Sequence, residues 1–145
     1  MSRPDERAAW ADEALDAGHG CRLLAKMANA EIVQKSLLHD DGEHYALAAW
    51  CVMPTHVHVL IEQRFETPLA DIVQTWKSAT AHVINKRENR KGRLWRREYF
   101  ERFMRSEEQL SNTVTYIENN PVAARLCERP EDWRFSSASW RRMER

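Results

Sequence analysis

The chain has 145 residues, of which 43% are hydrophobic and 30% charged, and this composition favours a single folded domain over a disordered chain. No apolar stretch approaches the roughly 20 residues that a membrane-spanning helix needs, and residues 1–16 lack the apolar centre of a signal peptide, so we expect a cytoplasmic protein without a membrane partner. The formal net charge is zero, so total charge gives no support for a nucleic-acid partner. Three scattered cysteines, Cys21, Cys51 and Cys127, argue against a disulfide framework or a zinc knuckle.

The N-terminal part of the chain predicts two helices. Residues 5–17 are rich in Ala, Glu and Leu and place Trp10 among small apolar residues, so we expect a helix that ends at Gly18. Asn29 is a suitable N-cap for a second, short helix over residues 30–38.

Two strands are predicted next, over residues 44–52 and 56–63. Pro54 lies in the connection, where it suits the entry of a strand better than its middle. The second strand alternates strictly, with Val57, Val59 and Ile61 on one face and His56, His58 and Leu60 on the other.

A longer helix follows. Thr67 is predicted as its cap and Pro68 as its first helical residue, and apolar residues recur at helical spacing through about residue 86.

The last long helix is predicted to begin at Ser106, where Gln109 completes a capping box. The sequence Asn-Asn-Pro at 119–121 is expected to weaken or end this helix. The aromatic residues of 131–145 are expected to pack back on the domain.

The two histidines at alternate positions of one strand, His56 and His58, project from the same face about 7 Å apart along the chain. Imidazole nitrogens placed this way can bind one divalent cation together. Taken alone, this pair is more simply interpreted as two polar residues on a half-exposed strand.

Tyr116 and Asn120 form a second pair, four residues apart on the last helix. Their face is rotated away from the apolar residues Val114 and Ile117, so Tyr116 is not only a core residue in this pattern. A structural tyrosine remains the alternative, because half-buried tyrosines are common.

Positive charge is concentrated in residues 86–105, with nine Lys or Arg against three Asp or Glu. Such a segment can track a phosphate backbone, and its interleaved aromatic rings can stack on unpaired bases. A solvated basic loop and rings buried in the core are the alternatives. The candidates for phosphate contacts are Lys77, Arg93, Arg96, Arg97, Arg102 and Arg105, and Trp95 is the candidate for base stacking.

Five blocks of this sequence, together with their order, resemble the single-tyrosine HUH transposases, and specifically the REP-associated tyrosine transposases of bacteria. The blocks are 50–60 (WCVMPTHVHVL), 76–78 (WKS), 94–102 (LWRREYFER), 116–126 (YIENNPVAARL) and 132–137 (DWRFSS). The resemblance covers residues 44–138 of a single domain spanning 1–145, with an atypical, helical part at 1–43.

The resemblance implies an α+β fold, the ferredoxin-like HUH-nuclease sandwich, in which helices pack on the faces of an antiparallel sheet. It implies that Tyr116 is the nucleophile and that His56, His58 and Asn120 hold a divalent ion, Mg²⁺ or Mn²⁺. The implied function is a transposase that cuts and rejoins single-stranded DNA near hairpins through a 5′-phosphotyrosine. The implied partner is hairpin DNA at the nucleoid, bound by a monomer or homodimer.

The sequence departs from the family's pattern at its start. Family members have a first strand beside the histidine strand, and the sequence of residues 1–43 does not predict one. Its loss favours an alternative, a catalytically silent, domesticated protein that binds DNA hairpins. Relaxases and replication initiators are a second alternative, disfavoured by the short chain and the single well-placed tyrosine. A structural metal protein is a third, with a poor set of ligands.

Overall fold

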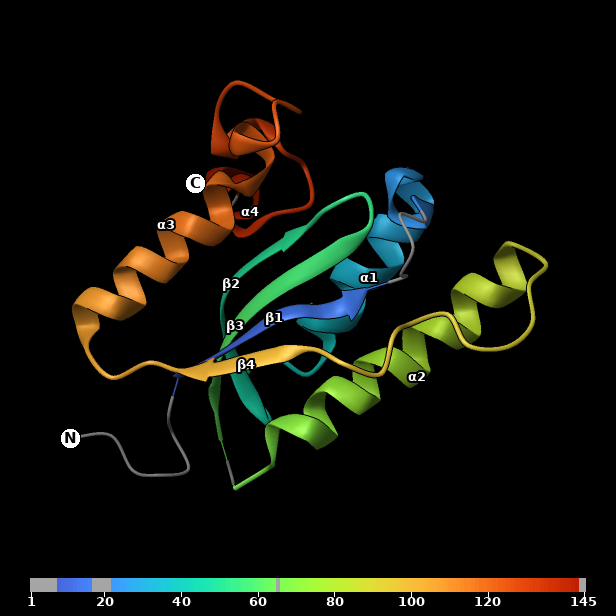
Figure 1. Ribbon diagram of the computed structural model, residues 1–145, viewed down its shortest axis with the longest axis horizontal. Coiled ribbons are helices and arrows are strands. Elements are labelled where there is room, and N and C mark those ends of the chain that lie inside the picture. The colour runs from blue at the N-terminus through green and yellow to red at the C-terminus, as the bar shows by residue number, and fades with distance from the viewer. Residues whose placement is uncertain (1–7, 17–21, 65, 144–145) are drawn as a thin grey trace.

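The computed structural model describes residues 8–16, 22–64 and 66–143. It contains a four-stranded sheet and four α-helices (Figure 1). In chain order the elements are β1 (Ala8–Asp16), α1 (Met27–His39), β2 (Tyr45–Val52), β3 (His56–Gln63), α2 (Leu69–Arg87), β4 (Phe100–Phe103), α3 (Glu107–Ala123) and α4 (Ser137–Met143). Short 3-10 helices, η2 (Leu23–Ala25) and η3 (Pro130–Asp132), precede α1 and α4. The predicted α+β class and antiparallel sheet are confirmed.

The sheet has the order β2-β3-β1-β4, and every neighbouring pair is antiparallel (Figure 1). The predicted helix over residues 5–17 is therefore wrong where the structure describes it, because Ala8–Asp16 is a central strand. The expected absence of a first strand beside the histidine strand is wrong for the same reason. Gly18, predicted to end that helix, lies outside the described residues.

The burial of alternate residues explains why β1 is a strand despite its helix-favouring composition. Ala9, Ala11 and Leu15 are fully buried, while Trp10 and Asp12 are partly exposed on the opposite face. Hydrogen bonding to β3 on one side and β4 on the other outweighs the helix preference of Ala and Glu, which amounts to only tenths of a kcal/mol per residue. The register with β3 shifts between Ala11 and Leu15, so the strand is irregular there.

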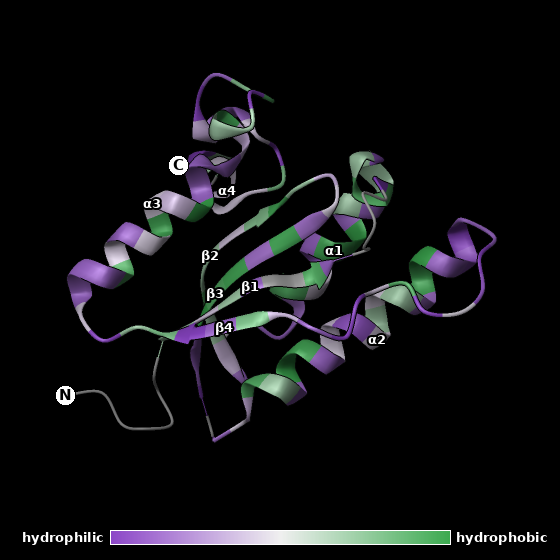
Figure 2. Ribbon diagram, viewed as in Figure 1, coloured by the Kyte–Doolittle hydropathy of each residue, from purple (hydrophilic) through white to green (hydrophobic). Residues whose placement is uncertain are grey.

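The two faces of the sheet carry different helices. On one face Val57, Val59 and Ile61 of β3 join the core beneath α1 and α2. On the other face Leu60 packs with Ile117 of α3. Figure 2 shows hydrophobic residues along β3, whereas the segment that follows α2 is hydrophilic. The alternation predicted for residues 56–63 is confirmed, and it places both histidines on the face that α3 covers.

The starts of α1 and α2 differ from the prediction. Asn29 does not cap α1, which begins two residues earlier at Met27. Its side chain is buried and donates to the Leu23 carbonyl and to Glu88, so its amide is used in tertiary contacts. For α2 the N-cap is Pro68, one residue later than predicted, with no side-chain capping bond.

Helix α3 begins as predicted and ends later. The Ser106 hydroxyl accepts a hydrogen bond from the Gln109 amide, while the Gln109 side chain accepts from the Arg105 amide, one residue before the cap. Pro121 lies inside the helix, which continues to Ala123, so the predicted break at 119–121 is wrong. Ile117 and Pro121 are both buried, and this packing offsets the roughly 3 kcal/mol that an internal proline costs.

The C-terminal residues pack on β2, as predicted. The Trp133 indole donates to the Val52 carbonyl, and the Val52 amide donates to the Phe135 carbonyl. Buried Glu118 of α3 binds Ser137 and Arg141 of α4, which locks the two helices together. No helix in the described part of the chain is long and apolar enough to cross a bilayer.

Candidate active site

The two histidines of β3 converge on one point. The Nε2 atoms of His56 and His58 are 3.1 Å apart, and the two rings meet edge to face. His58 is 4% exposed and His56 is half-buried. The pattern of the strand, with one residue between the histidines, produces this convergence because both side chains leave the same face.

Each ring is held by a neighbour at its other nitrogen. The Nδ1 atom of His58 lies 2.7 Å from Oδ1 of Asp12 on β1, a contact of hydrogen-bond length with an angle far from ideal. The Nδ1 atom of His56 lies 2.8 Å from the Thr55 hydroxyl. A carboxylate at Nδ1 favours the tautomer that leaves the Nε2 lone pair free. Both Nε2 atoms therefore face each other rather than their supporting partners.

The local charges favour a neutral His56 ring beside an ionised Asp12. Burial is the largest cause that lowers the pKa of His56 below its usual value, and the neighbouring His58 lowers it further. The interaction with His58 is the largest cause that lowers the pKa of Asp12, and it outweighs the opposite effect of burial. A neutral ring is the form that can donate a lone pair to a metal ion.

Tyr116 of α3 lies beside this pair. Its ring centroid is 6.2 Å from that of His58 and 5.4 Å from that of Trp10, in edge-on contacts. The side chain is 54% exposed. The structure thus brings together three of the residues that the sequence singled out, and leaves the phenol open to solvent.

Asn120 follows one turn later on the same helix, because α3 continues through Pro121. Its carboxamide nitrogen donates to the Tyr116 carbonyl at 3.2 Å. This bond turns the amide toward its own helix, which leaves the carboxamide oxygen as the atom that can reach a ligand. The proximity of Asn120 to Tyr116 agrees with the prediction, and its role as a metal ligand stays a prediction.

The donor set fits a divalent ion in part. Two nitrogens bound at about 2.1 Å to one ion lie about 3.0–3.4 Å apart at usual bond angles, and the two Nε2 atoms are 3.1 Å apart. Without an ion, the same separation allows one ring N–H to donate to the other ring. Among the described residues, no three His, Cys, Asp or Glu side chains form a metal cluster, so a third ligand from this part of the chain would be an amide or another neutral oxygen.

Asp12 and Trp10 are the site residues that sequence reasoning missed. Both lie on β1, which was predicted as a helix, and this error hid them. In the sequence, Trp10 and Asp12 alternate with the small apolar residues Ala9 and Ala11, which are buried in the structure. This alternation was the signal that could have indicated a strand. Trp10 also contacts Arg102 of β4, whose guanidinium lies 5.9 Å from the indole centroid.

A surface hollow of about 470 Å³ adjoins Tyr116. The Arg102 side chain lies on its rim with Trp10, and the N-terminal half of α3 forms its other wall. The residues that line it are Trp10, Arg102, Ser106, Glu108, Gln109, Asn112, Thr113 and Tyr116. Of the predicted phosphate contacts, Arg102 is thus the one the structure places beside the tyrosine, and Arg105 directly precedes the start of this wall.

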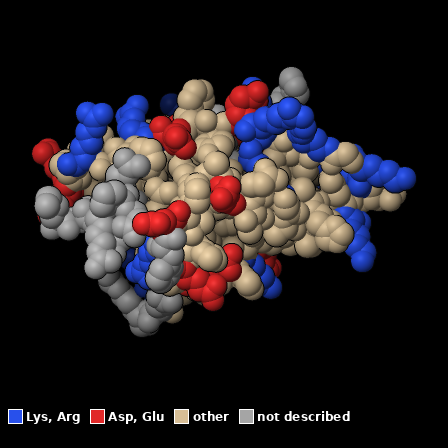
Figure 3. Space-filling view, turned by 90° about the horizontal axis from the view of Figure 1, so that it is seen from below, with Lys and Arg blue, Asp and Glu red and all other residues tan. Residues whose placement is uncertain are grey.

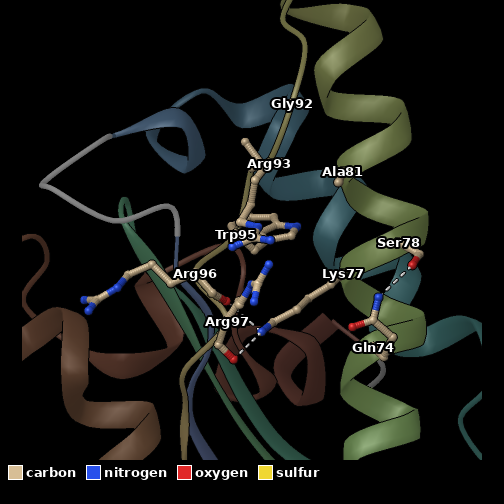
Figure 4. Close-up of a pocket in the computed structure, with 10 residues that line it drawn as sticks. Gln74, Lys77, Ser78, Ala81, Gly92, Arg93, Trp95, Arg96 and Arg97 are labelled. Atoms are coloured by element: carbon tan, nitrogen blue, oxygen red, sulfur yellow. Dashed lines mark hydrogen bonds between the residues drawn. The ribbon is translucent and has the colours of Figure 1, made fainter.

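The other basic candidates lie around a second hollow, between α2 and residues 92–97 (Figure 4). Lys77, Arg93, Arg96 and Arg97 line it. Figure 3 shows Lys and Arg side chains gathered at the corresponding end of the molecule, on the right of the view.

Trp95 is not the exposed stacking ring that the sequence suggested. The side chain is only 4% exposed, and its indole N–H donates to the Thr80 hydroxyl at 2.9 Å inside the core. A ring buried this way cannot offer its face to a base, so the stacking prediction is wrong. The indole instead anchors the basic segment to α2.

A strand with two histidines and a helix with a tyrosine meet on one face of an antiparallel sheet, which is the arrangement that the resemblance to single-tyrosine transposases implies. Residues 27–120 match the family model "Transposase IS200 like". This match covers more than half of the chain, and the protein therefore belongs to the IS200-like transposase family.

Individual relatives agree with this assignment. A Haemophilus influenzae protein named as a REP-associated tyrosine transposase is 28% identical over 115 residues, which are 71% of this chain and 65% of that protein. The chain thus spans slightly less than two thirds of the length of that relative.

One of two similar solved structures supports the fold. A REP-associated tyrosine transposase bound to a REP hairpin superposes with a TM-score of 0.71 at 18% identity, over 94% of this chain and 82% of the other. A Deinococcus radiodurans transposase gives a TM-score of 0.48 at 21% identity, over 82% and 92%. The first of these similarities shows that the two proteins share the fold.

Proposed function

We propose that this transposase cuts and rejoins single-stranded DNA beside a hairpin, through a 5′-phosphotyrosine on Tyr116. The observation that carries the proposal is the edge-on contact between the Tyr116 and His58 rings, 6.2 Å between centroids, at the point where the two Nε2 atoms converge. The exposed phenol is on the open side of the contact, where a phosphodiester can approach it.

In the proposed reaction the Tyr116 hydroxyl attacks the phosphorus and the bond to the 3′ oxygen breaks. The phenolic proton passes to solvent, and the departing 3′ oxygen takes up a proton. The phosphotyrosine keeps the energy of the phosphodiester, so a 3′-hydroxyl can attack it and rejoin a strand without a nucleotide triphosphate. The free phenol has a pKa near 10, so the surroundings of the bound phosphate have to favour its ionised form.

His56 and His58 are proposed to hold a divalent ion, with the carboxamide oxygen of Asn120 as a third ligand. Such an ion would polarise a phosphate oxygen and favour the charge that develops there. Asp12 and Thr55 orient the two rings from the opposite nitrogens. Arg102, over the Trp10 ring, supplies a positive charge beside the tyrosine.

The proposed substrate follows from the relatives and from the shape of the site. The matched structure was solved with a REP hairpin, and we extend that class of DNA to this chain. The strand is proposed to be unpaired at the cut, as the resemblance to single-tyrosine transposases implies. One chain supplies both Tyr116 and the histidines, so the proposed site needs no second copy.

The alternative of a silent hairpin-binding protein rested on a missing first strand. β1 occupies that position between β3 and β4, and this removes the observation that favoured the alternative.

The test uses oligonucleotides that carry the palindromic repeats flanking the gene, incubated with the protein and Mn²⁺. Wild-type protein is expected to form a covalent adduct that survives denaturing electrophoresis, and Tyr116→Phe is expected to form none. Tyr99→Phe is the matched control and is expected to keep the adduct, since Tyr99 lies in the basic segment beside Lys77.

Adducts formed by Tyr116→Phe would show that another residue is the nucleophile. Tight hairpin binding by the wild type without any adduct would support the silent alternative. Unchanged adduct formation in EDTA would contradict the metal role of His56 and His58.

A further inference from the structure

The hollow between α2 and residues 92–97 is separate from the tyrosine site and is not used by the reaction proposed above (Figure 4). It has a volume of about 580 Å³, within the range of small-molecule sites. The residues that line it are Gln74, Lys77, Ser78, Ala81, Gly92, Arg93, Leu94, Trp95, Arg96 and Arg97. None of them is acidic, and four carry a positive charge.

The arginine wall of the hollow is held in place from α2. The ammonium group of Lys77 donates to the Arg96 carbonyl at 2.7 Å and to the Arg97 carbonyl at 3.2 Å (Figure 4). Trp95, which directly precedes Arg96, is fixed because its indole N–H donates to the Thr80 hydroxyl of α2. Lys77 was predicted as a phosphate contact, but two of its three N–H donors bind the Arg96 and Arg97 carbonyls and so position the arginine wall.

The far end of the same wall is fixed by a turn. Asn85 of α2 donates from its side chain to the Gly92 carbonyl at 2.9 Å. Gly92 has a φ of +88°, a conformation that glycine adopts without strain. The segment is thus anchored at Gly92, Trp95 and Lys77, and the hollow is formed before any ligand arrives.

The charges around the hollow are available to an anion. No carboxylate in the described part of the chain forms an ion pair with Arg93 or Arg97 among the pairs within 4 Å. Arg96 has a loose contact with Asp16, at 3.7 Å. Guanidinium groups bind phosphate oxygens through paired N–H donors, which makes a phosphodiester the anion that this wall fits best.

The opposite wall is neutral and polar. On α2 the Gln74 amide donates to the Ser78 hydroxyl at 3.1 Å (Figure 4). This leaves the Gln74 carbonyl oxygen as an acceptor and the Ser78 hydroxyl as a donor toward the hollow. An amide and a hydroxyl are groups that read the edge of a base.

The hollow is connected to the histidine pair through β1. The Arg96 amide donates to the Asp16 carbonyl at 2.7 Å, and Asp16 is paired with His56 across β1 and β3. Arg96 is thus separated from His56 by one strand, β1. The hollow lies beside α2, on the sheet face opposite the histidines, so a DNA strand from the tyrosine site would pass around the β4 edge to reach it.

We infer that this hollow binds one unpaired nucleotide of the strand being processed, with its phosphate at Arg93 and Arg97 and its base against Gln74 and Ser78. The inference rests on the proposed function and adds a second point of contact for the same strand. A concave site favours an unstacked nucleotide over a duplex, since duplex recognition places a protruding element into a groove. Fixing one nucleotide here would hold the strand in register at Tyr116.

The test compares binding of a fluorescent single-stranded 20-mer with binding of the same sequence as a duplex, in EDTA, where covalent chemistry is not required. Arg93→Ala with Arg97→Ala is expected to weaken single-strand binding about tenfold or more. It is also expected to reduce the slope of log affinity against log salt by about 0.7 for each lost phosphate contact. Lys35→Ala with Arg142→Ala removes the same charge from exposed positions that lie outside the basic segment and do not line the hollow.

Photocrosslinking gives a second readout that does not depend on these variants. A 4-thiothymidine 20-mer is expected to crosslink to peptides that contain residues 74–78 or 92–97, as identified by mass spectrometry. Equal losses for single strand and duplex, equal losses in the Lys35/Arg142 control, or crosslinks confined to other segments would each overturn the inference. The adduct assay on Tyr116 stands apart from these results, so the two proposals can fail separately.

Discussion

Replacing Asp12 by Asn is expected to weaken the proposed metal binding at the histidine pair while leaving the fold intact. The substitution keeps the size of the side chain but removes the charge that lies 2.7 Å from Nδ1 of His58. A charge-assisted hydrogen bond of good geometry is worth about 1.5–3 kcal/mol, and the angle of this contact is poor. The Asp12 side chain is 31% exposed, so solvent screens part of this and the lower end applies, about 1.5 kcal/mol or roughly tenfold in affinity.

The measurement is a titration of the metal-free protein with Mn²⁺, in which the free ion is followed by electron paramagnetic resonance. Asp12→Asn is expected to raise the dissociation constant about tenfold, in the range usual for groups that orient a ligating histidine. Glu62→Gln is the matched control, because it removes one exposed carboxylate from β3 at a distance from the histidines. A dissociation constant for Asp12→Asn within twofold of wild type would refute the role assigned to Asp12.

Two stability predictions concern residues that position the site. Trp95→Ala is expected to lower the free energy of unfolding by about 3–5 kcal/mol in urea denaturation, because it empties a buried site and leaves the Thr80 hydroxyl without its donor; a loss below 1 kcal/mol would instead favour an exposed ring. Arg141→Ala is expected to cost about 2–3 kcal/mol, since Glu118 would stay buried without its cation. This loss of unfolding free energy is smaller than that for a fully buried ion pair, because water can reach the half-exposed Arg141. The control Arg142→Ala, at an exposed position, is expected to cost far less.

The histidine strand was predictable because its information is local. Val57 and Val59 are apolar, His56 and His58 are polar, and one face of a half-buried strand has to be apolar. The meeting of the histidines with Tyr116 was not local. It followed from the resemblance to a known family, and the structure places the two groups in contact.

β1 shows why the rest was not predictable. Residues 8–16 favour a helix when their composition alone is considered, but they pair with β3 and β4, which lie far away in the sequence. Tertiary pairing of this kind overrides the small differences between intrinsic propensities. Asp12 could be recognised as a partner of His58 only once the strand was known.

Trp95 shows the same limit for a single side chain. A tryptophan between basic residues suits both a core anchor and a stacking ring, and the sequence does not distinguish them. The decision depends on Thr80, fifteen residues away on α2, whose hydroxyl accepts the indole N–H.

The position of β1 in the middle of the sheet has a consequence for the newly made protein. β4 pairs with β1 and not with β3, so the edge that carries Arg102 cannot dock until the first strand has been inserted. The phenol arrives later still, on α3. A partly synthesised chain therefore holds His56 and His58 without Tyr116, so the proposed cleavage site is complete only after α3 has been made.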